Sequence, residues 1–307
     1  MNLRILHEDE HVIVCYKPAG IATQTAKMGS QDMESLLKNY LYKKEKKLPY
    51  VAVIHRLDQP VEGILVFAKT PLAAKELNKG LQGVGFGKYY KAVVCGTPKE
   101  KKAMLEDYLV KDGKTNTSRI GTVNEKDAKK AILNYEVEKE LEDSSIIKVH
   151  LQTGRFHQIR AQFSNIGNSL LGDVKYGSNI SKELSMKKRI NKIALCANHL
   201  VLKHPVTGKE MEFTLDKKYL PKWYIEKYID GQFDIHETGR EKGIIFGIPA
   251  ELIEGILVNN DIKNNKQTLG YIHKIFPDCY ICDIMLPTNR KGRKQVPSFL
   301  FDIMQYI

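Results

Sequence analysis

The sequence predicts an α+β fold: a central, mainly antiparallel mixed sheet with flanking helices, followed by a small C-terminal α+β appendage. Three observations indicate this fold. Strand-like runs outnumber helical ones, several are paired across short turns, and strands and helices do not alternate regularly along the chain. Hydrophobic residues make up 42% of the chain, which is enough to build a buried core.

Each element is predicted from its local pattern. Runs of β-branched and aromatic residues bounded by turn residues indicate strands, and apolar residues three to four positions apart indicate helices. We expect strands within 3–16 (two, around an acidic turn) and at 50–54, 63–68, 89–95, 131–139, 145–151, 200–205 and 210–215. We expect helices at 31–47, 71–82 and 157–167, surface hairpins or loops over 99–130, and a loop at 172–177.

The distribution of charge suggests two domains. The formal net charge is +12, and residues 231–307 contribute nine basic and nine acidic residues, so the whole excess lies in residues 1–230. We therefore predict a large domain at 1–230 and a small folded appendage of unknown role at 231–307. An excess of this size favours a polyanionic partner or an acidic membrane surface.

Composition and termini limit the other classes of protein. Five scattered cysteines are not a disulfide framework, and we interpret the Cys279–Cys282 pair as alternating strand residues, not zinc ligands. The N-terminus lacks an apolar signal core, and no apolar run is long enough to cross a bilayer. The sequence therefore predicts a cytoplasmic protein without a metal site or a membrane contact.

Three polar segments are candidates for chemistry. The first, 55–63, follows a strand and places Asp58 at a proline turn; the second, 88–96, carries Tyr90 on a strand. The third, 151–160, packs Arg155, His157, Gln158 and Arg160 after another strand, and is typical of phosphate or base contacts. Taken separately, each also has an ordinary explanation: a turn cap, a strand aromatic and a solvated helix face.

Together and in this order, the segments resemble the RluA-type family of RNA pseudouridine synthases. The family's Lys-Pro-(small)-Gly element is matched at 17–20, and its His-Arg-Leu-Asp motif with a later Gly is matched at 55–58 and 63. Its Lys-x-Tyr-x-Ala-x-Val-x-Gly motif is matched at 88–96, Thr-Gly-Arg-x-His-Gln-Ile-Arg at 153–160, Gly-Asp-x-x-Tyr-Gly at 172–177 and His-Pro-x-Thr-Gly at 204–208. The chain departs from the usual Thr-Ser with Val61-Glu62, which we interpret as a feature of a subgroup.

The resemblance implies the isomerisation of specific uridines to pseudouridine in structured RNA, either rRNA or tRNA. It implies that Asp58 is the catalytic carboxylate, either as nucleophile at C1′ or as base at C2′, and the sequence leaves both routes open. Arg160 would pair with Asp58 and lower the pKa of that carboxyl by roughly 1–3 units. Tyr90 would pack against the uracil and is a candidate for moving the C5 proton.

The resemblance also implies further contacts. Arg56 would fill the gap left when the base leaves its stack. The remaining candidates for substrate binding are Lys17, Lys88, Arg155, His157 and Gln158. The reaction oxidises nothing and activates no group, so we expect no cofactor and no metal, and we expect a monomer that binds RNA.

Two alternatives remain. The first is a catalytically inactive homologue that binds RNA in ribosome assembly; the presence of Asp58, Tyr90 and Arg160 favours the enzyme. The second is a glycosidase with paired carboxylates, for which Glu62 is the sole nearby partner of Asp58.

Overall fold

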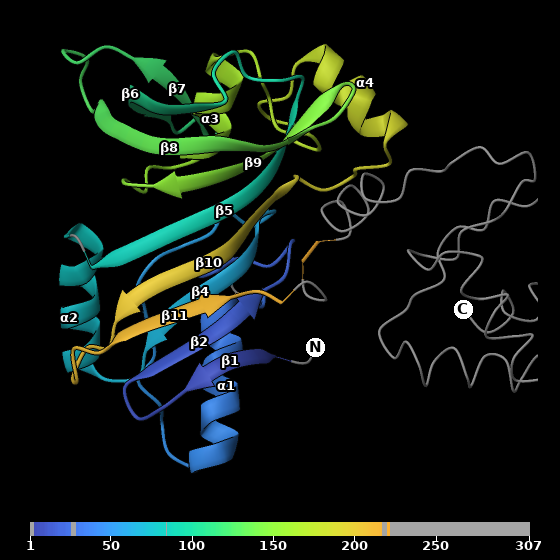
Figure 1. The fold of residues 1–307 in the computed structure, drawn as a ribbon. Helices are drawn as coiled ribbons and strands as arrows, with labels where there is room; N and C mark the ends of the chain where they lie inside the picture. The colour runs from blue at the N-terminus through green and yellow to red at the C-terminus, as the bar shows by residue number, and fades with distance from the viewer. Residues whose placement is uncertain (1–2, 26–28, 84, 217–219, 222–307) are drawn as a thin grey trace, which may run out of the picture. The chain divides into compact units, whose positions relative to one another are not determined.

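In a computed structural model, the described residues are 3–25, 29–83, 85–216 and 220–221. One large mixed sheet runs through them, in the order β1-β2-β4-β10-β5-β9-β8-β6-β7, with β11 paired to β10 and β3 to β4 (Figure 1). All the described pairs are antiparallel except β4 with β10. The predicted α+β class with a mainly antiparallel sheet is confirmed.

The strands form hairpins where the sequence has short polar turns. They are β1 (Arg4–Glu8), β2 (Val12–Lys17), β3 (Ala52–Val53), β4 (Glu62–Ala68), β5 (Phe86–Cys95), β6 (Lys102–Asp112), β7 (Thr117–Gly121), β8 (Lys129–Glu140), β9 (Ser144–Leu151), β10 (Leu195–Lys203) and β11 (Glu210–Thr214). The polar segment 99–130 contains one long hairpin, β6–β7, instead of several short ones.

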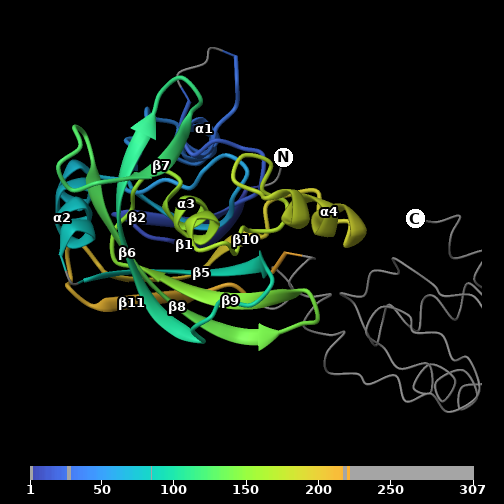
Figure 2. The same cartoon turned by 90° about the horizontal axis from the view of Figure 1, so that it is seen from above.

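The four described helices are α1 (Met33–Glu45), α2 (Pro71–Gln82), α3 (Gln158–Asn165) and α4 (Asn179–Lys187). α1 begins with a capping box in which the Asp32 carboxylate accepts from Ser35 N and the Ser35 hydroxyl accepts from Asp32 N. Thr70 caps α2 directly before Pro71, a residue suited to the first helical position. α1 and α3 cover one face of the sheet, and their apolar residues join its main core (Figure 2).

The structure differs from the sequence prediction in two places. The strand expected at 50–54 is only two residues long, because the chain leaves β3 for an irregular loop that carries the segment 55–60. α4 was not predicted, because its pattern is not amphipathic in the usual sense: Ile180 and Met186 are exposed, and Ser181 and Ser185 are buried.

The parallel pair of β4 and β10 depends on Gly63. Gly63 has φ +135°, and a Cβ at this position would lie 2.3 Å from the carbonyl oxygen of Ala197. A side chain would therefore push β10 away from β4. This explains in physical terms why a glycine stands five residues after Asp58, where the loop enters the sheet.

The predicted appendage at 231–307, including the Cys279–Cys282 pair, lies outside the described residues. Among the helices that are described, none combines the length and the apolar character needed to span a membrane.

Candidate active site

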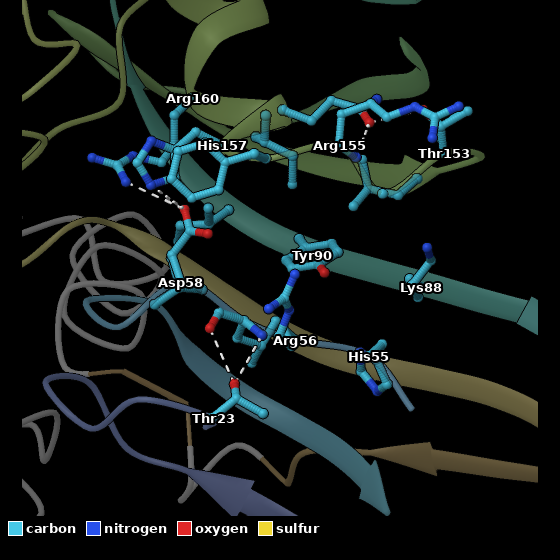
Figure 3. Close-up of a pocket in the computed structure, with 18 of the residues that line it drawn as sticks. Thr23, His55, Arg56, Asp58, Lys88, Tyr90, Thr153, Arg155, His157 and Arg160 are labelled. Carbon is cyan, nitrogen blue, oxygen red and sulfur yellow. Dashed lines mark hydrogen bonds and ion pairs between the residues drawn. The ribbon is translucent and has the colours of Figure 1, made fainter. Parts of the chain in front are cut away.

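A cavity of about 930 Å³ opens on the sheet face that carries α3. Its walls come from the loop 53–61, strand β5, the segment 151–160 and the residues 22–24 (Figure 3). Five basic residues line it, and Asp58 is the single carboxylate among its described lining residues. The three polar segments singled out in the sequence thus meet at one place.

The loop that carries Asp58 is fixed to the segment 17–24. The Thr23 hydroxyl accepts from Leu57 N and donates to Leu57 O, both at 3.1 Å. Gly20 N donates to Gln59 O at 2.8 Å, and Gln59 Nε2 donates back to Gly20 O at 3.0 Å. These bonds give an irregular loop a defined conformation, which a catalytic carboxylate requires.

Lys17 helps to hold the loop that carries Asp58 and is not among the described residues that line the cavity. Its side chain is 0% exposed, and its ammonium donates to the carbonyls of Pro18, Ile21 and Gln59 at 3.1, 2.7 and 3.1 Å. Burial lowers the pKa of Lys17 to about 8. The expected contact between Lys17 and the substrate is therefore wrong: all three donors are used inside the protein.

Arg160 connects Asp58 to a second carboxylate, Asp173. Arg160 Nη1 lies 3.2 Å from Asp58 Oδ2, whereas Nε and Nη2 each lie 2.7 Å from an oxygen of Asp173. The Asp173 side chain is 0% exposed and also accepts from the backbone N–H groups of Lys175 and Tyr176. The bidentate pair with Asp173 fixes the guanidinium, and the fixed guanidinium orients Asp58.

The pKa of Asp58 departs from the direction that the sequence suggested. Burial raises the pKa of this carboxyl above its ordinary value, and Arg160 and Lys17 oppose that shift only in part. Arg160 lowers the pKa as expected, but the net shift is upward, because desolvation of the carboxylate is the larger effect. The side chain is nevertheless 23% exposed, so that the cavity gives access to it.

His157 lies beside Arg160 and faces the same carboxylate. Its Nε2 is 3.5 Å from Asp58 Oδ2, and its Nδ1 is 2.9 Å from the hydroxyl of Tyr176. The ring stacks on Phe156 at 3.8 Å between centroids. The imidazole therefore points at Asp58 and is partnered on its other side.

Tyr90 forms the middle of the cavity, between Asp58 and Lys88 (Figure 3). Lys88 and Tyr90 lie two residues apart on β5 and so face the same side of the sheet. Burial raises the pKa of Tyr90 further above its ordinary value, and the nearby Asp58 adds to the shift. The hydroxyl is consequently protonated at neutral pH.

The positive residues at the other end of the cavity are Lys88 and Arg155. Lys88 is 8% exposed, and no hydrogen-bond acceptor for its ammonium occurs in the described part of the chain. A Cβ on Gly154 would lie 3.1 Å from Lys88 Nζ, so the glycine leaves room for the ammonium. Arg155 uses Nε for the carbonyl of Lys130 at 2.8 Å, and Arg56 is exposed at the cavity.

Gln158 holds the segment 153–155 in place. Its Oε1 accepts from Thr153 Oγ1 at 2.7 Å and from Arg155 N at 3.0 Å. The side chain is buried in the wall of the cavity, so that it supports Arg155 directly. His55 is likewise a buried wall residue, with a pKa lowered to about 3 by burial.

Three residues around Asp58 were not assigned a role from the sequence: Asp173, Tyr176 and Ser118. The first two belong to the Gly-Asp-x-x-Tyr-Gly motif at 172–177, which signalled the family but not the contact with Arg160 and His157. Ser118 lies in the hairpin β6–β7, and its N–H bonds the Tyr176 hydroxyl at 2.5 Å. Ser118 has no sequence signal of its own.

The Glu62 side chain does not face Asp58 in the cavity. Glu62 accepts a hydrogen bond from the Tyr16 hydroxyl and is not among the described residues that line the cavity. A pair of facing carboxylates, which a glycosidase uses, is therefore not formed by Asp58 and Glu62. Among the residues that the structure describes, no group of three or more His, Cys, Asp or Glu side chains is placed to hold a metal ion.

Comparisons with known proteins agree with the geometry. Residues 11–165 match the family described as RNA pseudouridylate synthase. A ribosomal large subunit pseudouridine synthase D of Zymomonas mobilis is 32% identical over 219 residues, which cover 69% of this chain and 68% of that protein. An uncharacterized RNA pseudouridine synthase of Bacillus subtilis is 32% identical over 229 residues, with 73% and 72% covered.

Solved structures have the same fold. Human RNA pseudouridylate synthase domain containing 4 has a TM-score of 0.60 at 19% identity, with 76% of this chain and 94% of that chain covered. Human RNA pseudouridylate synthase domain containing 1 has a TM-score of 0.57 at 21% identity, with 72% and 85% covered.

The fold and the match over half of the chain define the class: the chain belongs to the RNA pseudouridylate synthase family. Its relatives include the large-subunit synthases C and D, and so the chain is an RNA pseudouridine synthase of the RluA type.

Proposed function

We propose that this enzyme isomerises specific uridines of large-subunit rRNA to pseudouridine, with Asp58 as the catalytic carboxylate. The observation that carries the proposal is the position of Asp58: it is the single described carboxylate in a basic cavity, held by Arg160 and still accessible. The relatives named as ribosomal large subunit synthases support rRNA over tRNA. We assign the reaction to residues 1–230.

The reaction breaks the N1–C1′ bond, turns the uracil, and bonds C5 to C1′, while a proton leaves C5 and one is gained at N1. An ionised Asp58 can attack C1′ or remove a proton at C2′. Both routes use the charged form, which burial disfavours and Arg160 favours. A carboxylate whose charge is only partly compensated is more reactive than a fully paired one. Less stabilisation of its charge must be lost in the transition state.

Tyr90 supplies an aromatic surface for the uracil in the middle of the cavity. The raised pKa of its hydroxyl disfavours the tyrosinate. We therefore assign Tyr90 to stacking and to hydrogen-bond donation, and not to removal of the C5 proton as a base.

RNA phosphates would meet Lys88 and Arg155, and Arg56 would occupy the space left by the extruded base. Lys88 is a buried ammonium without an acceptor in the described part of the chain, a state that an anionic ligand would relieve. Lys17 and Gln158 hold the loops behind these contacts. The enzyme would need no cofactor, and we expect it to act as a monomer.

The test is pseudouridine mapping of rRNA and tRNA from cells that lack the gene. The expected result is loss of one or a few pseudouridines in large-subunit rRNA, restored by wild type but not by Asp58→Asn. The matched control is Asp127→Asn, which removes the charge of an exposed carboxylate and should restore the mark. An unchanged map after deletion would instead favour the inactive RNA-binding homologue, and a loss confined to tRNA would correct the substrate.

A further inference from the structure

Two nitrogen atoms, one of which donates a hydrogen bond to Asp58, face the same oxygen of its carboxylate. Arg160 Nη1 lies 3.2 Å and His157 Nε2 lies 3.5 Å from Oδ2. No donor to Oδ1 is found among the residues that the structure describes. In that part of the chain the carboxylate is therefore held through one oxygen, and its other oxygen faces the cavity without a partner.

The hydrogen bonds of the Tyr176 hydroxyl indicate which nitrogen of the His157 imidazole carries the proton. Ser118 N–H can only donate, so at 2.5 Å the Tyr176 oxygen accepts from it. The single Tyr176 proton is then free to be donated to His157 Nδ1 at 2.9 Å, which would place the imidazole proton on Nε2, toward Asp58. The opposite tautomer would point a lone pair of Nε2 at the carboxylate, which is repulsive.

The charge of the ring agrees with this assignment. Burial lowers the pKa of His157 to about 3, and Arg160, Lys175 and Lys111 lower it while Asp173 opposes them. The imidazole is therefore neutral at neutral pH. A neutral donor orients Asp58 without adding a second positive charge that would stabilise the carboxylate and reduce its reactivity.

The backbone at His157 supports a functional role for the ring. His157 precedes α3 with φ 53° and ψ 28°, in the left-handed region that a non-glycine residue rarely adopts. The strain is compensated by the surrounding contacts, and such residues cluster at functional sites. His157 and Arg160 are three residues apart, and so both side chains meet the same carboxylate.

We propose that His157 is a positioning residue: as an Nε2–H donor fixed by Tyr176 and Ser118, it shares Oδ2 of Asp58 with Arg160 and presents Oδ1 to the ribose of the target uridine. His157 thus acts on the catalytic carboxylate and not on RNA, in contrast to the contact that the motif suggested. The inference rests on the proposed function.

The experiment compares His157→Gln with His157→Asn. The amide nitrogen of Gln can occupy the place of Nε2. The amide nitrogen of Asn occupies the place of Nδ1, because the Asn side chain is too short to reach Asp58. Asn tolerates left-handed backbone well, so its defect cannot be assigned to strain. Rates of pseudouridine formation at saturating RNA, RNA affinity and Tm are measured on rRNA from the deletion strain.

We expect His157→Asn to reduce the rate on the order of 10- to 100-fold with RNA affinity changed by less than about threefold. His157→Gln should recover most of the rate. Tyr176→Phe, which frees Nδ1, should reduce the rate by roughly 3- to 10-fold. Tyr135→Phe is its control, because that hydroxyl donates to the carbonyl oxygen of Glu100, away from His157.

Equal rates for the Gln and Asn variants would overturn the proposal, as would a loss in RNA affinity with an unchanged rate. Failure of the proposed function is distinguishable, because wild type would then form no pseudouridine or Asp58→Asn would remain active.

Discussion

Asp58 and Asp173 share the guanidinium of Arg160, but the structure holds them very differently. Asp173 has no exposed side-chain surface and accepts four hydrogen bonds, two from Arg160 and two from backbone N–H groups. Asp58 is 23% exposed and accepts a single bond from Arg160, at the longer distance of 3.2 Å. One arginine thus connects a structural carboxylate to a reactive one.

The difference shows how orientation and reactivity are separated in this site. A carboxylate with four short donors is well stabilised and is a poor nucleophile or base. A carboxylate with few donors keeps its reactivity but needs something rigid to hold it. Here the rigid object is Arg160, and Asp173 makes it rigid.

The largest effect is expected from Asp173→Ala. Removing this carboxylate leaves Arg160 buried with only Asp58 as partner, and breaking a buried pair costs about 3–5 kcal/mol of the free energy of unfolding. Urea denaturation should show this loss, and pseudouridine formation should fall as well. Glu142→Ala, at an exposed position without positive φ, is the control and should change stability by less than about 0.5 kcal/mol. A similarly small change for Asp173→Ala would contradict its structural role.

A smaller effect, dependent on pH, is expected from Lys17→Met, which tests the fixation of the Asp58 loop. The pKa of Lys17 is lowered from 10.5 to about 8 in the folded protein. Between these values the unfolded chain binds one more proton, so the contribution of Lys17 to stability rises as pH increases through 8 toward 10.5. The gain is at most about 3 kcal/mol.

The measurement is urea denaturation of both proteins at several pH values between 7 and 10.5. The difference in the free energy of unfolding, wild type minus Lys17→Met, should increase over this range. Lys114→Met replaces an exposed lysine and should give a constant difference. A constant difference for Lys17→Met as well would show that the ammonium of Lys17 is not desolvated in solution.

The smallest effect is expected on the stability of Asp58→Asn. Since burial raises the pKa of Asp58, the folded state favours the neutral form, and the ionised carboxyl opposes folding at neutral pH. The neutral amide should therefore leave Tm unchanged or slightly higher, although activity is lost. Thermal denaturation of wild type and Asp58→Asn at pH 7 measures this difference in Tm. A fall of more than about 4 °C, near 1 kcal/mol for a domain of this size, would mean that Asp58 stabilises the fold as Asp173 does.

Sequence reasoning reached those features that depend on local pattern or on motif. The hairpins, α1 and α2 follow from alternation, caps and turn residues, and the pairing of Asp58 with Arg160, 102 residues apart, came from the family resemblance. Lys17 was misjudged, because a lysine in a motif suggests a phosphate contact and burial is a tertiary property. The net shift of Asp58 was misjudged for the same reason, since desolvation cannot be read from neighbours in sequence.

Strand β10 has a consequence for how the site comes into being during synthesis. It lies between β4 and β5, which are consecutive strands in the sequence, and pairs with both. Asp58 precedes β4, while Tyr90 lies on β5 and Arg160 follows β9. The two halves of the sheet therefore carry the two halves of the site, and a segment made more than a hundred residues after Asp58 joins them. A growing chain on the ribosome has all the catalytic residues before it has an active site.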